Sequence, residues 1–63
     1  MFKVVMKAMY GVEYTVVKGA KDICLSTYAW LLENNSDKYF NDLLVWKVVV
    51  QDEAGVSLRE ELV

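Results

Sequence analysis

The chain has 63 residues, of which 56% are hydrophobic, and its nine acidic and seven basic residues give a net charge of −2. This length allows one small domain, and this hydrophobic content excludes an intrinsically disordered chain. One cysteine and no histidine exclude an internal disulfide and argue against a zinc site. We therefore expect a single domain over residues 1–63 with no metal and no cofactor.

The seven basic residues are scattered along the chain and form no stripe that could follow a phosphate backbone, so we expect no nucleic-acid partner. No apolar run approaches the roughly 18 residues of a membrane-spanning helix. Residues 1–12 lack the basic region and uninterrupted apolar stretch of a secretory leader, because Lys7 interrupts them. Together with the unpaired thiol, this predicts a cytoplasmic protein with no membrane partner.

Residues 2–17 predict a β-hairpin. A three-residue loop at 9–11, with Gly11 in the left-handed conformation, would place Met6 opposite Tyr14 and Val4 opposite Val16. One side of the hairpin is then entirely apolar, and we assign it to the core: Phe2, Val4, Met6, Ala8, Val12, Tyr14 and Val16. The other side carries Lys3, Val5, Lys7, Glu13, Thr15 and Val17, and Lys7 faces Glu13 as an opposite-charge pair.

Residues 22–35 predict a helix that begins at Asp22 as its N-cap and ends in the cluster Asn34-Asn35-Ser36. At about 100° per residue, one broad arc of this helix is apolar and is expected to cover the sheet. That arc consists of Cys24, Leu25, Tyr28, Leu31 and Leu32. We interpret Cys24 as an inert buried thiol. Ile23, Thr27 and Trp30 fall on an adjoining arc, outside the expected core.

Ser36 is a candidate cap for a further helical turn over 37–42, which would be followed by a strand over 43–51 rich in β-branched residues. Strict alternation in this strand would turn Leu44, Trp46, Val48 and Val50 inward and leave Val45 and Val49 outward. The tail, residues 56–63, is ambiguous. Alternation favours a strand with Val56, Leu58 and Leu62 inward, whereas Ser57 and Glu60 fit a helix capping box.

The predicted fold class is α+β: one small ββαββ domain with an antiparallel or mixed sheet and one helix packed on one face. This element order resembles the β-grasp arrangement of small immunoglobulin-binding and ubiquitin-like domains. Fold resemblance alone implies no function.

Catalytic chemistry has little support in the sequence. Without histidine, Ser-His and Cys-His nucleophile pairs cannot form, and the isolated glycines are far from a phosphate-binding loop. We therefore predict no enzyme activity and no catalytic residues. The features that a folded monomer does not need are apolar side chains expected outside the core, since large apolar and aromatic side chains concentrate where proteins bind one another. These candidate interface residues are Ile23 and Trp30 on the helix and Val5, Val17, Val45 and Val49 on the outer sheet face.

In size, acidity and hairpin-helix-strand order, residues 2–50 resemble small bacteriophage-encoded proteins that bind and inhibit host enzymes. The resemblance implies a non-enzymatic inhibitor or regulator of a larger protein, such as a bacterial host enzyme, in the host cytoplasm. A self-assembling homodimer, or a small subunit of a complex, is the alternative. A nucleic-acid binder that stacks bases on Tyr10, Tyr14 and Trp46 is a third reading, which the negative net charge disfavours.

Overall fold

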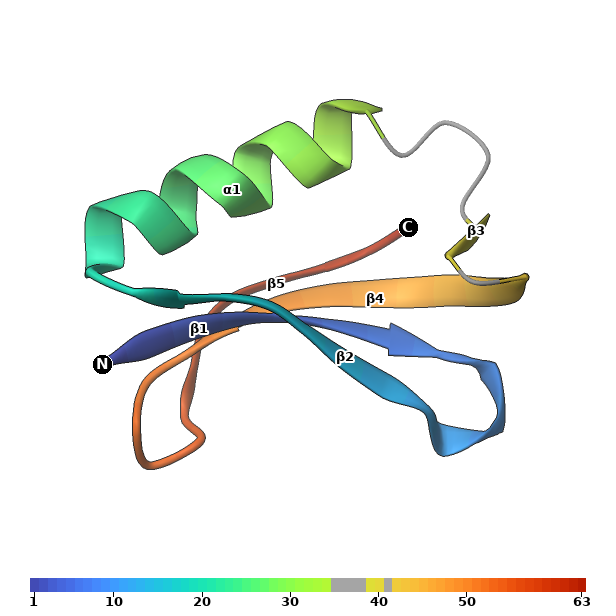
Figure 1. The fold of residues 1–63 in the computed structure, drawn as a ribbon, viewed down its shortest axis with the longest axis horizontal. Helices are drawn as coiled ribbons and strands as arrows, with labels where there is room; N and C mark the ends of the chain where they lie inside the picture. The colour runs from blue at the N-terminus through green and yellow to red at the C-terminus, as the bar shows by residue number, and fades with distance from the viewer. Residues whose placement is uncertain (35–38, 41) are drawn as a thin grey trace.

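The computed structural model describes residues 1–34, 39–40 and 42–63, and it shows one helix lying across one face of an antiparallel sheet (Figure 1). The elements in chain order are β1 (Phe2–Ala8), the short 3-10 turn η1 (Met9–Gly11), β2 (Glu13–Gly19), α1 (Lys21–Asn34), β3 (Tyr39–Phe40), β4 (Leu43–Gln51) and β5 (Ser57–Leu62). The four long strands lie in the order β2-β1-β4-β5, and the short β3 also pairs with β4. The predicted α+β class is confirmed.

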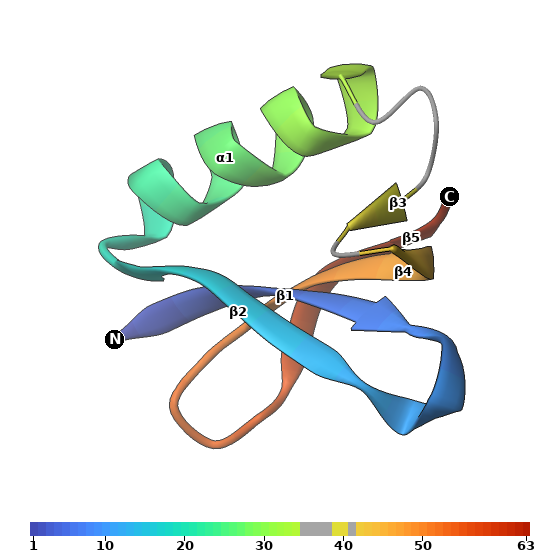
Figure 2. The same ribbon diagram turned by 45° about the vertical axis from the view of Figure 1, so that its right-hand side comes forward.

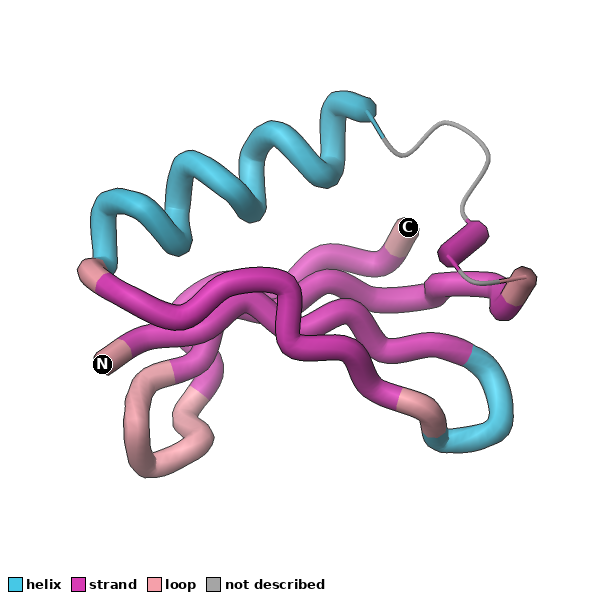
Figure 3. Tube along the Cα trace, in the orientation of Figure 1, coloured by secondary structure: helices cyan, strands magenta, loops and turns pink. Residues whose placement is uncertain are grey.

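The resemblance to the β-grasp arrangement extends to the element order and to the single helix on one face. Every strand pairing among the described residues is antiparallel, including the central pair β1–β4. Figure 2 shows α1 and β3 on the same side of the sheet, and Figure 3 shows both long hairpins turning away from the helix.

The accessible surface, 4172 Å², is close to the roughly 4,200 Å² expected of a folded 7.3 kDa monomer.

The β1–β2 hairpin has the predicted three-residue loop. The Ala8 N–H donates to the Val12 carbonyl at 2.7 Å, and both Tyr10 (φ 63°) and Gly11 (φ 73°) adopt left-handed backbone conformations. The expected pairs Met6–Tyr14 and Lys7–Glu13 are present.

A β-bulge in β2 changes the second half of this hairpin. Val5 lies opposite Thr15 but Val4 lies opposite Val17, so Val16 is the extra residue. Val17 therefore packs against the core, whereas Val16 is 39% exposed. The sequence predicted that Val16 points inward and Val17 outward, and both orientations were wrong. One inserted residue moves the side chains beyond it to the opposite face of the sheet.

A second irregularity lies between β1 and β4. Lys7 faces Lys47, but Ala8 faces Val45, so Trp46 is the extra residue. Val48 and Val50 are buried as predicted. Val45 is buried too, so its predicted outward orientation was wrong. Leu44 and Trp46 were predicted to point inward, but they are exposed by 37% and 46%. The Trp46 indole Nε1 donates to the Ala8 carbonyl at 3.1 Å, and this bond anchors the bulged residue.

Residues 57–62 form a strand, as alternation in the tail favoured. A shift in pairing between Val50 and Gln51 leaves Leu58 half-buried against the core. Val56 and Leu62 are exposed by 58% and 72%, so their predicted inward orientation was wrong. Arg59 and Glu61 lie opposite the core residues Val50 and Val48 instead.

The helix packs on β4, β1 and β2 with the arc predicted for it. Cys24 and Tyr28 are buried, and Leu25, Leu31 and Leu32 are half-buried against the same core. Asp22 lies inside the first turn, where its carboxylate accepts from the Ile23 N–H at 3.0 Å, so it is not the N-cap residue expected.

The further helical turn expected over 37–42 is absent where the chain is described. Residues 39–40 form strand β3, which pairs with Leu43 and Leu44. The candidate cap Ser36, the terminator Asn35 and residues 37, 38 and 41 lie outside the described residues.

Candidate protein-interaction surface

Two apolar side chains of α1 project away from the core. Ile23 is 53% exposed and Trp30 is 61% exposed. They are seven residues apart, which places them on one side of the helix, with the half-buried Thr27 between them. We call these three residues the Ile23–Trp30 flank.

The backbone beneath this flank is held by local side-chain hydrogen bonds. The Thr27 hydroxyl donates to the Ile23 carbonyl at 2.9 Å, and the Asn34 amide donates to the Trp30 carbonyl at 2.9 Å. The backbone carbonyls of Ile23 and Trp30 therefore each accept a hydrogen bond from the side chain four residues later in the helix. The flank presents apolar side chains from a regular helix rather than from a loop, which limits the conformational entropy lost on binding.

The direction of the flank follows from the helix period and from Tyr28. Burial raises the pKa of the Tyr28 hydroxyl above its ordinary value, and the Glu61 carboxylate in β5 raises it further. At about 100° per residue, Ile23 and Trp30 lie about 140° and 160° around the helix from Tyr28, which is at the centre of the arc that packs on the sheet. The Ile23–Trp30 flank therefore points largely away from the sheet, which agrees with its exposure.

The β2 edge has unpaired backbone groups. Among the described residues β2 pairs with β1 alone, so one row of its N–H and C=O groups has no strand partner. On the core face near this edge, the Phe40 ring meets the Tyr14 ring edge-on with centroids 4.7 Å apart, and Phe40 remains 42% exposed. Phe40 was not among the predicted interface residues, because it fell in a segment expected to be helical.

The outer sheet face does not have the four exposed valines that were predicted. Val17 and Val45 belong to the core face, as described above. Val5 and Val49 do lie on the outer face, directly opposite each other, but they are only 2% and 1% exposed. Of the six predicted interface residues, only Ile23 and Trp30 are exposed.

Long polar side chains account for the burial of Val5 and Val49 on the outer sheet face. Lys3, Lys7 and Lys47 occupy neighbouring outer positions and are half-buried. Glu60 lies opposite Val49 and accepts an ion pair from the Lys47 ammonium at 3.2 Å. The aliphatic stems of these residues cover the valines while their charged ends stay in water.

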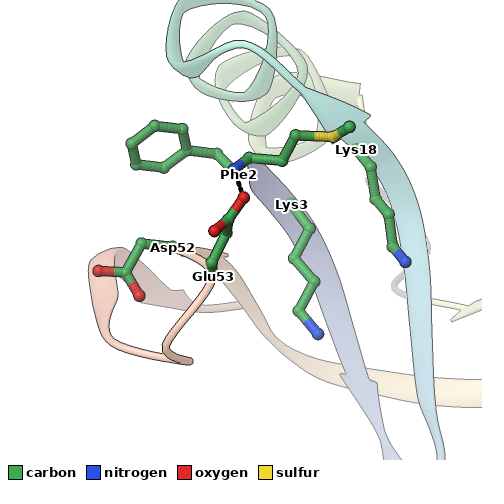
Figure 4. A pocket seen from close by; sticks show the side chains of 6 residues that line it. Phe2, Lys3, Lys18, Asp52 and Glu53 are labelled. Atoms are coloured by element: carbon green, nitrogen blue, oxygen red, sulfur yellow. Dashed lines mark hydrogen bonds and ion pairs between the residues drawn. The ribbon is translucent and has the colours of Figure 1, made fainter.

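A shallow hollow of about 320 Å³ lies at the end of the sheet where β1 begins and β4 ends (Figure 4). It is lined by Met1, Phe2, Lys3, Lys18, Asp52 and Glu53. The terminal amine of Met1 is paired with the Glu53 carboxylate. The lining side chains of Lys3 and Lys18 extend from neighbouring strands into solvent. The hollow thus mixes opposite charges in an open setting and presents no buried polar group that could orient a substrate.

No polar or charged side chain among the described residues is buried, and those residues contain no cluster of metal-ligating side chains. Cys24 is fully buried, as predicted for an inert thiol. In the same residues, no helix is long and apolar enough to span a membrane.

Comparison with known proteins identifies no relative: no family model, no curated protein and no solved structure matches this chain. The site must therefore be interpreted from its own geometry.

Proposed function

We propose that this chain is a small non-enzymatic protein-binding module that acts through the Ile23–Trp30 flank of its helix. The observation that supports this most directly is the contrast within α1. Its other large apolar side chains are buried or half-buried against the sheet, whereas Ile23 and Trp30 are more than half exposed. Tryptophan on a rigid helix is a frequent anchor of protein interfaces.

In this proposal the bound protein is larger than the module, and binding inhibits or regulates it, as in the phage proteins that the sequence resembles. A bacterial host enzyme is the kind of target that this resemblance suggests, and the host cytoplasm is then the site of action. The antiparallel scaffold suits such a role, since it presents the flank from a regular helix.

The test is capture from a bacterial lysate with the immobilised chain and two variants. Trp30→Gln removes the proposed anchor, and Leu62→Gln is the matched control, because Leu62 is 72% exposed on β5. We expect one lysate protein retained by the natural chain and by the Leu62 variant but lost by the Trp30 variant. A protein retained equally by all three would place the binding surface elsewhere. If no lysate protein is retained and the chain does not bind itself, the proposed function fails.

A second candidate function is self-assembly into a homodimer. The observation that favours it is that β2 pairs with β1 alone among the described residues, which leaves one row of its N–H and C=O groups for a strand of a second copy.

A further inference from the structure

We infer that the outer sheet face, the face opposite α1, binds single-stranded nucleic acid through its lysines and the Trp46 indole. This inference goes beyond the proposed function, because it concerns the other side of the molecule. The Ile23–Trp30 flank points away from the sheet on the helix side, so both surfaces can be occupied at once.

Strand pairing brings together lysines that are scattered along the chain. Residues that pair across neighbouring strands point to the same face of the sheet. Lys3 pairs with Lys18, and Lys7 pairs with Lys47. The outer face therefore carries these four of the seven basic residues. The sequence alone predicted no nucleic-acid partner because their gathering depends on the order of the strands.

The outer face has fewer carboxylates than lysines. The outer positions of the four long strands hold two carboxylates, Glu13 and Glu60. Glu60 is paired with Lys47 at 3.2 Å, and within the described chain the other three outer lysines form no ion pair. The outer face is therefore positive, although the whole chain has a net charge of −2. An anionic partner is complementary to it.

The ammonium groups of Lys3 and Lys18 are available to an anion at one end of this face. Figure 4 shows both side chains extending from neighbouring strands into solvent. The two carboxylates that line the same hollow are engaged elsewhere. Glu53 pairs with the terminal amine, and Asp52 accepts from two backbone N–H groups of its own turn at 2.9 Å. Neither carboxylate therefore neutralises these two lysines.

The Trp46 indole supplies an aromatic surface on the same face. Its Nε1 donates to the Ala8 carbonyl at 3.1 Å, and the Lys47 ammonium lies 5.8 Å from the centroid of the ring. The hydrogen bond holds the ring beside an outer lysine while nearly half of the residue stays exposed. Unpaired bases stack on such aromatic side chains while lysines contact the phosphates. An acidic peptide would use the lysines alone, so the exposed indole favours a nucleic acid.

The width of the face favours a single strand over a duplex. The strands β2, β1, β4 and β5 span about 14 Å at ~4.8 Å per strand, before side chains are counted. The major groove of a duplex is only ~12 Å wide and admits a two-stranded ribbon. A single strand can instead lie along β1, where Lys3 and Lys7 are about 13 Å apart at ~3.3 Å per residue.

The experiment is a fluorescence titration of the Trp30→Phe variant, in which Trp46 is the remaining tryptophan. In about 20 mM salt, single strands of dT or of U, each about 12 nucleotides long, should quench Trp46 emission with a Kd of about 1–100 µM. The strand that binds more tightly identifies the partner as DNA or RNA. Emission that neither strand changes up to about 500 µM overturns the inference.

The salt dependence of binding counts the lysines in contact. Three outer lysines without an ion pair, at ~0.7 each, give a slope of about −2 for the logarithm of the association constant against that of salt concentration. The double variant Lys3→Gln with Lys18→Gln should reduce the slope to about −0.7 and weaken binding more than tenfold in about 20 mM salt.

A matched pair of substitutions on the helix side controls for net charge. Lys21 begins α1, and Arg59 lies opposite the core residue Val50, so neither is on the outer face. Lys21→Gln with Arg59→Gln removes the same charge and should leave the slope unchanged. Circular dichroism checks that each variant is folded. An equal loss of binding in both double variants would show that binding follows net charge alone, and would overturn the site.

Two further probes test the class of partner. The annealed duplex should leave Trp46 emission unchanged, because its bases are already stacked, and quenching equal to that of the single strand would overturn base stacking. Oligoglutamate of the same charge should compete poorly. If it displaces the strand at equal concentration, the face binds acidic protein segments and the inference fails. These outcomes do not involve the Ile23–Trp30 flank, so the lysate test of the proposed function succeeds or fails separately.

Discussion

Truncation of Val45 provides the sharpest test of the irregular β4 strand. Regular alternation would bury Leu44 and expose Val45, whereas the structure leaves Val45 only 1% exposed and Leu44 37% exposed. Val45→Ala removes two buried carbon groups at ~0.8 kcal/mol each and leaves a cavity, so we expect a loss of about 2–3 kcal/mol. Leu44→Ala removes more atoms but from a partly hydrated site, and should cost about 1 kcal/mol.

The assay is urea unfolding followed by circular dichroism, with the midpoint compared at constant m value. Domains of this size rarely exceed ~3–5 kcal/mol of stability, so Val45→Ala should leave a marginally folded chain. Its melting temperature should fall by about 8–24 °C, at roughly 4–8 °C per kcal/mol. If Leu44→Ala proves more damaging than Val45→Ala, the bulge at Trp46 is refuted and the strand alternates regularly.

Three further predictions concern the Tyr28 hydroxyl, the Trp46 indole hydrogen bond and the hairpin loop. Burial and nearby acidic charge raise the pKa of Tyr28, so the folded state holds the hydroxyl proton more tightly than the unfolded chain does. Stability should therefore be intact below pH ~10 and fall above it. Tyr28→Phe should flatten that decline in thermal melts between about pH 9 and 11.5. Trp46→Phe removes the hydrogen bond to the Ala8 carbonyl and should lower the urea midpoint by the equivalent of about 1 kcal/mol. An unchanged midpoint would mean that water donates to the Ala8 carbonyl in place of the indole N–H without cost. Tyr10 has a left-handed backbone and is 84% exposed, so Tyr10→Asn should stabilise the chain by about 0.5–1 kcal/mol. Gly11→Ala should destabilise the chain by about 1 kcal/mol. A melting temperature that is lower for the Tyr10 variant than for the Gly11 variant would contradict the loop geometry.

The sequence allowed the elements to be predicted where local chemistry determines them. The loop at Gly11 requires left-handed backbone, the β-branched residues of 43–51 favour a strand, and the helix period selects the arc centred on Tyr28. These signals are local, and each was confirmed. The register from Lys7 to Glu13 was also predicted, because the loop length determines it.

What could not be predicted depends on pairing between distant strands. Val16 and Trp46 are extra residues only in relation to β1, and nothing in their own neighbourhoods marks a bulge. Each bulge reverses the orientation of the residues beyond it, which is why Val17 and Val45 were assigned to the wrong face. The burial of Val5 and Val49 was missed for a related reason, since it depends on which long side chains lie beside them in three dimensions.

The candidate surface shows the same division. Ile23 and Trp30 were identified from the helix period alone, and both are exposed. That β2 forms an edge of the sheet in the described residues could not be predicted from the helix period, because it depends on the order of the strands.

The central pairing of β1 with β4 has a consequence for how the chain reaches its folded state. The β1–β2 and β4–β5 hairpins join neighbouring segments and can form early, but β1 meets β4 only when residues near opposite ends of the chain are brought together. Closing that long loop costs entropy before any contact is gained, so this seam sets a high contact order for so short a chain. The sequence has no proline, so no slow isomerisation accompanies this step. Refolding should therefore be a single exponential whose rate reports when the two hairpins meet.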